Sequence, residues 1–226
     1  MNEYIAFRQE HGIDDKSYKD LYLGDYFRIQ DGTYNAEWIV AHFDYYYNKG
    51  EPVGPKGVVL IPGDTSCGSS KMNNTDTSVG GYASSIANTT VCPAIATALQ
   101  RVLGSYLLTI SARLTYTINT SIPSMAGANW QGASTNWNWV TTQCILPNEI
   151  QLCGSNVCSS SFYDTAEACD KLAVFNFINC VYIHRATFWL RNVASSTNFS
   201  RATITGITDA YGASNSYAIR PLIYIG

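Results

Sequence analysis

The side chains that can supply nucleophilic or metal-binding chemistry are seven cysteines and three histidines. A thiolate beside an imidazole is an activated nucleophile, and such residues meet in space rather than along the chain. For zinc, the nearest grouping is Cys153, Cys158 and Cys169, which are unevenly spaced and have no histidine close by. The pattern favours buried thiols in a reducing compartment over a metal site or a catalytic cysteine.

Other catalytic motifs are missing from the sequence. It contains no G-x-S-x-G elbow, phosphate-binding loop, glycine-rich dinucleotide turn or HExxH helix. The adjacent carboxylates Asp14 and Asp15 stand in a charged stretch, where solvated side chains are the rule. We therefore expect a protein that is not an enzyme and that has neither a metal site nor another cofactor.

Charged residues are scarce, at 14% of the chain against about 25% in ordinary soluble domains. Between residues 72 and 148 the only charges are Asp76, Arg101 and Arg113. A long uncharged surface predicts burial against other proteins or other copies, and hence a homo-oligomer. The net charge of −3 does not indicate the positively charged surface that binds nucleic acid.

The chain has no apolar run of membrane-spanning length, and its polar start lacks the apolar core of a signal peptide. We expect no membrane insertion and synthesis in the cytoplasm.

Periodicity and turn residues predict one loop-rich α+β domain over residues 21–226, preceded by an arm over residues 1–20 that is a possible attachment segment. A short helix is expected at 2–11, and Asp31-Gly32 predicts the turn of a β-hairpin. Further expected elements are strands at 26–29, 37–43, 58–61 and 106–118, helices at 82–89 and 93–103, and a short helix from Pro147.

Two stretches have the composition of binding surfaces. Residues 187–226 place Asn, Thr, Ser and Tyr between apolar anchors, as antibody combining loops do. Residues 127–139 interleave Trp130, Trp137 and Trp139 with small polar residues. These tryptophans are either a contact platform for a carbohydrate or protein, or the anchors of a loop-rich core.

The C-terminal stretch resembles a known family. Trp189-Leu190-Arg191, then Val193-Ala194-Ser195, Phe199, Gly206 and the closing Ile219-Arg220-Pro221 are similar to the "WLR…VAS…F…G…VRP" ending of C-type-lectin-fold proteins in phages and bacteria. That group includes variable proteins of diversity-generating retroelements, formylglycine-generating-enzyme-like domains and a phage and Firmicutes domain of unknown function. Looser similarity extends to residue 21.

The resemblance implies a C-type-lectin-like (formylglycine-generating-enzyme-like) α+β fold with short antiparallel sheets and two or three short helices. In such proteins conserved anchors hold the sheet, and exposed positions between them contact the ligand. The implied structural frame is Trp189, Arg191, Phe199, Gly206, Arg220 and Pro221. The implied ligand-binding face is His184, Arg185, Asn192, Asn198, Arg201, Thr203, Thr205, Tyr211, Asn215 and Tyr217.

This sequence departs from the family's pattern at two points, and each departure argues against one of the functions known in the family. Asp209 is the only carboxylate after Asp170, which argues against a calcium-dependent sugar site. The last cysteine is Cys180, upstream of the frame, which argues against the paired-cysteine chemistry of formylglycine-generating enzymes.

The resemblance therefore implies a phage virion structural protein, either a capsid or tail decoration or a receptor-binding tip. Its implied partners are other virion proteins, contacted through the arm and the low-charge surface, and a host-surface protein or glycan. The alternative function is a lectin-like binding domain that is not part of a virion. A third hypothesis is an enzyme of the formylglycine-generating type.

Overall fold

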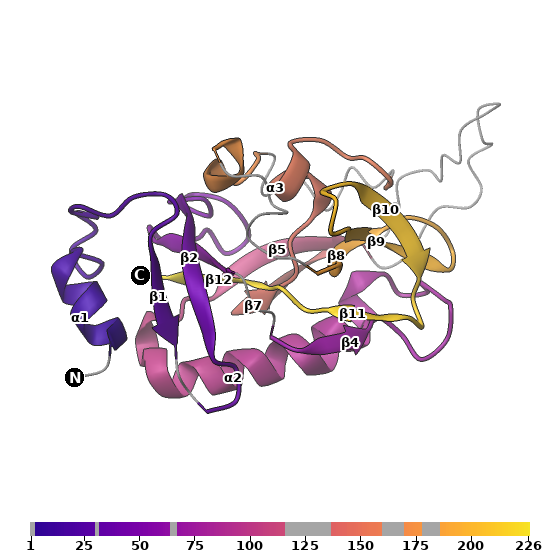
Figure 1. The fold of residues 1–226 in the computed structure, drawn as a ribbon, viewed down its shortest axis with the longest axis horizontal. Coiled ribbons are helices and arrows are strands. Elements are labelled where there is room, and N and C mark those ends of the chain that lie inside the picture. Colours follow the sequence, from indigo (N-terminus) through magenta and orange to yellow (C-terminus); the bar gives the residue numbers. More distant parts are fainter. Residues whose placement is uncertain (1–2, 30–31, 64–66, 116–136, 160–169, 178–185) are drawn as a thin grey trace.

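The computed structural model describes residues 3–29, 32–63, 67–115, 137–159, 170–177 and 186–226 (Figure 1). These residues form an α+β structure of mostly short antiparallel strands and a few short helices, which confirms the expected fold class at this level. None of the helices within these ranges is long and apolar enough to cross a membrane.

The first five-stranded sheet has the order β1-β2-β3-β12-β7. Its strands are β1 (Tyr26–Ile29), β2 (Ala36–Phe43), β3 (Val58–Pro62), β12 (Leu222–Ile225) and β7 (Cys144–Ile145). The predicted hairpin is confirmed, since β1 and β2 pair antiparallel. The C-terminal strand β12 lies between β3 and β7, so this sheet joins both ends of the chain.

The second five-stranded sheet, hereafter the C-terminal sheet, has the order β10-β9-β8-β11-β4. Its strands are β4 (Ser69–Lys71), β8 (Phe188–Val193), β9 (Asn198–Ala202), β10 (Thr208–Gly212) and β11 (Ser216–Ala218). Only the pairing of β11 with β8 is parallel, through Ala218 and Phe188. A separate antiparallel pair joins β5 (Ile110–Thr115) to β6 (Trp137–Thr142).

The helices are short except for α2 (Cys92–Leu103), which runs along the long axis of the molecule (Figure 1). Its predicted apolar stripe is confirmed by the burial of Ile95, Leu99 and Leu103. The other helical segments are α1 (Glu3–Glu10), η1 (Tyr82–Ser84), η2 (Ala87–Val91), η3 (Gly104–Tyr106), α3 (Glu149–Cys153) and η5 (Ala173–Asn176).

The helix expected at residues 82–89 is divided. Ser85 is extended, with a ψ of 153°, and ends the 3₁₀ turn η1. Its hydroxyl then accepts a hydrogen bond from the Asn88 N–H at 3.2 Å. A serine that caps the next segment competes with helix continuation, which explains why a new helix starts here.

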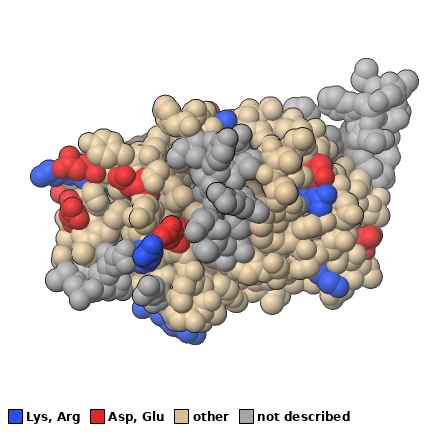
Figure 2. All heavy atoms as spheres, viewed as in Figure 1, with Lys and Arg blue, Asp and Glu red and all other residues tan. Residues whose placement is uncertain are grey.

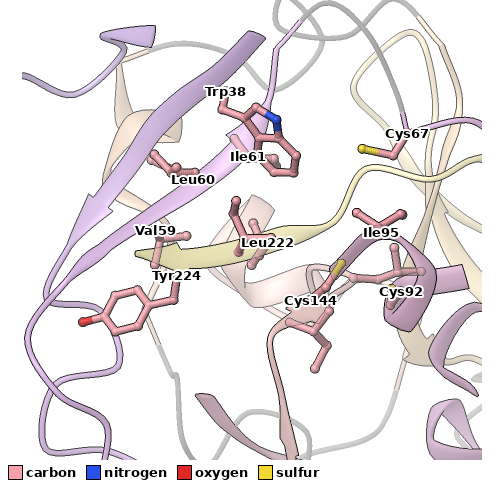
Figure 3. Close-up of a cluster of buried hydrophobic side chains, with 14 of the residues drawn as sticks. Trp38, Val59, Leu60, Ile61, Cys67, Cys92, Ile95, Cys144, Leu222 and Tyr224 are labelled. Atoms are coloured by element: carbon pink, nitrogen blue, oxygen red, sulfur yellow. The ribbon is translucent and has the colours of Figure 1, made fainter. Parts of the chain in front are cut away.

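The core lies between β3, β12 and α2, and Figure 3 shows part of it. Both central strands are buried along their whole length, with Leu60 and Leu222 among the fully buried side chains. Fully buried strands of this kind read as unbroken apolar runs in the sequence, as VVLIP does.

The described part of the N-terminal arm packs on the first sheet. The Phe7 and Phe27 ring centroids are 4.5 Å apart, and Ile13 is fully buried. The Arg8 guanidinium lies 3.8 Å from the centre of the Tyr106 ring. These contacts bring the arm into the same hydrophobic core as residues 21–226.

Candidate functional site

Five of the six frame residues implied by the family resemblance lie in the interior, and the sixth, Gly206, is half-buried. Trp189, Arg191, Phe199 and Arg220 are fully buried, and Pro221 is buried beside them. An interior arginine must be hydrogen-bonded, because an unpartnered buried charge is costly. The Arg220 Nε accordingly donates to the Pro62 carbonyl at 2.7 Å, and its guanidinium lies 5.2 Å from the centre of the Phe188 ring.

Gly206 shapes the hairpin between β9 and β10. Its φ of 81° lies in the left-handed region that glycine adopts without strain, and its N–H donates to the Thr203 carbonyl at 3.0 Å. This turn sets the register of the two strands, which pairs Arg201 with Asp209. The neighbouring pairing of Trp189 with Arg201 extends the row onto β8.

Five side chains gather on one face of the C-terminal sheet, and we call them the aromatic–arginine cluster: Trp189, Arg201, Asp209, Tyr211 and Tyr217. Arg201 Nε and Nη2 donate to the two carboxylate oxygens of Asp209 at 2.6 and 2.9 Å. The Arg201 guanidinium lies 4.0 Å from the Tyr211 ring centre and 4.5 Å from that of Tyr217.

The two tyrosine rings meet edge to face, with centroids 5.8 Å apart. Tyr217 also packs edge to face on Trp189 at 4.9 Å, and the Trp189 indole N–H donates to the Ser70 carbonyl at 2.9 Å. The buried indole is therefore the member of the cluster that lies deepest in the protein. Tyr211, at 42% exposed, is its most accessible ring.

The surroundings of Arg201 and Tyr217 raise the pKa of both side chains. The hydrogen bonds that Arg201 donates to Asp209 raise the pKa of Arg201 above its ordinary value. Desolvation raises the pKa of the Tyr217 phenol, even though the nearby Arg201 charge opposes the shift. Both shifts favour the protonated forms, so Arg201 stays a cation and the Tyr217 phenol stays neutral around neutral pH.

The other expected face residues are dispersed. Asn198 begins β9 and lies opposite Gly212, whose carbonyl accepts from Asn215 Nδ2 at 3.0 Å. Thr203 and Thr205 lie past the other end of β9, with their hydroxyls 2.9 Å apart. His184 and Arg185 lie outside the described residues. Of the expected set, the structure brings together Arg201, Tyr211 and Tyr217.

Asn192 was expected on the ligand-binding face, and the structure corrects this assignment. Its side chain is fully buried. The Oδ1 accepts from the Glu149 N–H at 2.7 Å, and Nδ2 donates to Ser159 Oγ at 3.0 Å. Since β8 is buried along its entire length, every side chain of this strand lies in the interior, and none belongs to an exposed face.

Glu149 is a buried acidic residue whose carboxylate oxygens accept hydrogen bonds from neighbouring residues. It accepts hydrogen bonds from the N–H groups of Val157, Cys158 and Ser159, at distances from 2.7 to 3.2 Å, and from the Ser159 hydroxyl at 3.0 Å. A buried carboxyl group whose oxygens accept this many hydrogen bonds stabilises the loop that donates them. Sequence reasoning gave this residue no functional role.

The described cysteines are free thiols. Cys67, Cys92 and Cys144 are buried in the core, and all three are labelled in Figure 3. Cys153 and Cys158 contact Thr208 at 3.3 and 3.2 Å, and burial raises the pKa of Cys158 to about 11. Such a thiol is not ionised at neutral pH and is a weak nucleophile.

No group of three or more His, Cys, Asp or Glu residues within the described ranges is placed to hold a metal ion. Cys169, one of the three thiols considered for zinc, lies outside those ranges.

A cavity of about 340 Å³ opens behind the β9–β10 turn, away from the cluster. It is lined by Leu152, Cys153, Lys171, Phe175, Asn176, Phe177 and Gly206.

The tryptophan stretch is only partly described. Trp130 lies outside the described residues. Trp137 and Trp139 belong to β6, where Trp139 is half-buried and pairs with Arg113 of β5. This position places Trp139 on a separate two-stranded sheet.

Asp209 is the cluster member that sequence reasoning missed as a contact residue. The signal for it was available, because a hairpin turn near Gly206 sets residues 201 and 209 opposite each other. Comparison with known proteins adds no further assignment: no family model, no curated protein and no solved structure matches this chain.

Proposed function

We propose that this chain is a structural protein of a phage virion, with a C-type-lectin-like fold, which displays the outer face of its C-terminal sheet toward the host. It works by binding rather than catalysis and requires no cofactor. Its partners are other virion proteins, further copies of itself, and a molecule of the host surface.

The observation that carries this proposal is that the C-terminal sheet has one set of side chains that anchors it in the core and another set that lies toward the surface. Trp189 of β8 and Phe199 of β9 are buried anchors. Arg201, Tyr211 and Tyr217, on β9, β10 and β11 of the same sheet, form a polar and aromatic group toward the surface. A rigid sheet that carries aromatic and hydrogen-bonding side chains is well suited to recognition, because little entropy is lost when they bind.

The charge distribution supports assembly with other proteins. In the view of Figure 2, charged side chains lie at the end of the N-terminal arm and also at the opposite end, and much of the remaining described surface is uncharged. Interface cores are depleted in charged residues. An uncharged surface of this extent fits contacts with neighbouring subunits on a particle.

A second candidate is a lectin-like binding domain that is not part of a virion. It is favoured by the N-terminal arm, whose Phe7 and Ile13 are buried in the chain's own core instead of being free to attach elsewhere. The two candidates share the ligand-binding face and differ in what holds the protein in place.

Mass spectrometry and cryo-electron microscopy of purified phage particles from the producing strain separate the two. The virion proposal expects the protein at a stoichiometric copy number, with Tyr211 facing outward. Clean particles that lack the protein would reject the virion role and leave the free binding domain.

A further inference from the structure

The aromatic–arginine cluster holds a fixed arrangement of donors and acceptors. The hydrogen bonds to Asp209 use Arg201 Nε and one N–H of Nη2. No described residue accepts a hydrogen bond from Nη1, so its two N–H groups remain for a ligand. The two tyrosine rings hold the guanidinium in place, which reduces the entropy lost on binding.

The charges of the cluster select the kind of ligand. Arg201 and Asp209 cancel each other, and the carboxylate is the more exposed partner, at 41% against 15% for the arginine side chain. An anionic ligand that reached Arg201 would meet Asp209 at contact distance, and a cationic ligand would meet Arg201. A neutral ligand avoids both repulsions.

Hydroxyl groups match the pair better than peptide groups do. A hydroxyl both donates and accepts, so two adjacent hydroxyls can accept from Arg201 and donate to Asp209 at once. A main-chain peptide unit directs its N–H and C=O to opposite sides and cannot do this alone. Tyr211 beside the pair offers an aromatic ring for the C–H face of a sugar ring.

We infer that the aromatic–arginine cluster is a binding site for a neutral hexopyranose with adjacent hydroxyls, as found in uncharged surface glycans. The inference rests on the proposed function, since it names the ligand class of the same face. In this arrangement Arg201 and Asp209 bind the hydroxyl pair, Tyr211 stacks on the ring, and the phenol of Tyr217 is a further neutral donor.

The first test measures binding of the full chain to an array of neutral hexose oligosaccharides, with uronic-acid oligosaccharides printed beside them. We expect binding to neutral sugars to fall at least tenfold in Tyr211→Ala and in Asp209→Asn. The matched controls are Tyr26→Ala, an exposed tyrosine, and Glu37→Gln, whose carboxylate pairs with Arg28 across β1 and β2 at 2.6 Å. Binding to uronic-acid sugars alone would overturn the inference.

The second test uses host-cell envelopes treated with protease or with periodate, which oxidatively cleaves the C–C bond between two carbons that carry adjacent hydroxyl groups. Binding that periodate destroys, protease spares and Tyr211→Ala removes supports the inference. Binding that protease destroys and periodate spares, still lost in Tyr211→Ala, overturns the sugar assignment and leaves the proposed face intact. Binding that none of the face variants alters rejects the face itself, and with it this inference.

Discussion

Arg201 and Asp209 face each other across β9 and β10, joined by two parallel hydrogen bonds of 2.6 and 2.9 Å. Arg28 and Glu37 form a similar cross-strand ion pair in the first sheet, at 2.6 Å. In the C-terminal pair two tyrosine rings lie against the guanidinium, and the buried Trp189 packs on one of those rings. Since the pair in the first sheet has the same cross-strand chemistry outside the cluster, it is a matched control.

Asp209→Asn should cost little stability. The Asp209 side chain is 41% exposed, and solvent-screened ion pairs contribute about 0.2–1 kcal/mol. We expect the free energy of unfolding, measured by urea denaturation, to fall by no more than about 1 kcal/mol. Glu37→Gln should behave alike. A much larger loss for Asp209→Asn would mean that the pair stabilises the fold, and that its binding phenotype reflects unfolding.

The sequence predicted the features that depend on neighbouring residues. The Asp31-Gly32 turn indicated the β1–β2 hairpin, and the apolar stripe of α2 indicated its buried side. The hairpin and the apolar stripe follow from turn chemistry and local periodicity. The frame was implied by the family resemblance, and its members Trp189 and Arg220 are buried.

The features that were missed depend on long-range packing. Asn192 is polar, and its hydrogen-bond partner Glu149 is 43 positions away in the sequence. No local pattern indicates that both are sealed into one network with Ser159. The division of residues 82–91 into two helical types likewise depends on one serine hydroxyl.

Glu149→Ala should destabilise the protein strongly. The substitution leaves the N–H groups of Val157, Cys158 and Ser159 without their acceptor. The Ser159 bond is buried and the other two are part-buried, and an unsatisfied buried donor costs about 1–3 kcal/mol. We expect a loss of at least about 3 kcal/mol in the free energy of unfolding, allowing for partial rehydration of the loop. Chemical denaturation measures this loss, and Glu51→Ala at an exposed position is the control. A loss below about 1 kcal/mol would show that the loop is not held by this carboxylate.

His42 should make stability depend on pH. Burial, aided by the charge of Lys49, lowers its pKa below the ordinary 6.5, and Nδ1 accepts a hydrogen bond from the Ala173 N–H at 3.0 Å. The unfolded chain therefore takes up a proton first as the pH falls, so stability is full above about pH 7 and declines below about 6.5.

The measurement for His42 is the free energy of unfolding from pH 8 to pH 5 in the wild type and in His42→Asn. The asparagine amide keeps an acceptor near the Nδ1 position but does not titrate, so the decline from this site should disappear. Equal pH slopes in the two proteins would show that His42 is not the titrating group.

Arg220→Ala tests whether the closing arginine is structural. Arg220 is fully buried, and its Nε donates to the Pro62 carbonyl at 2.7 Å. Removing it leaves that carbonyl without this donor and opens a cavity beside Phe188, so we expect a loss of about 3 kcal/mol or more in the free energy of unfolding.

Arg220→Lys should recover only part of this loss, because an ammonium cannot reproduce the planar fork of the guanidinium. Thermal melts of both variants, with ligand binding measured below their melting temperatures, distinguish the two roles of this side chain. A lowered melt with binding retained assigns Arg220 to the frame. An unchanged melt with binding lost would move it to the ligand-binding face, which its burial between Pro62 and Phe188 argues against.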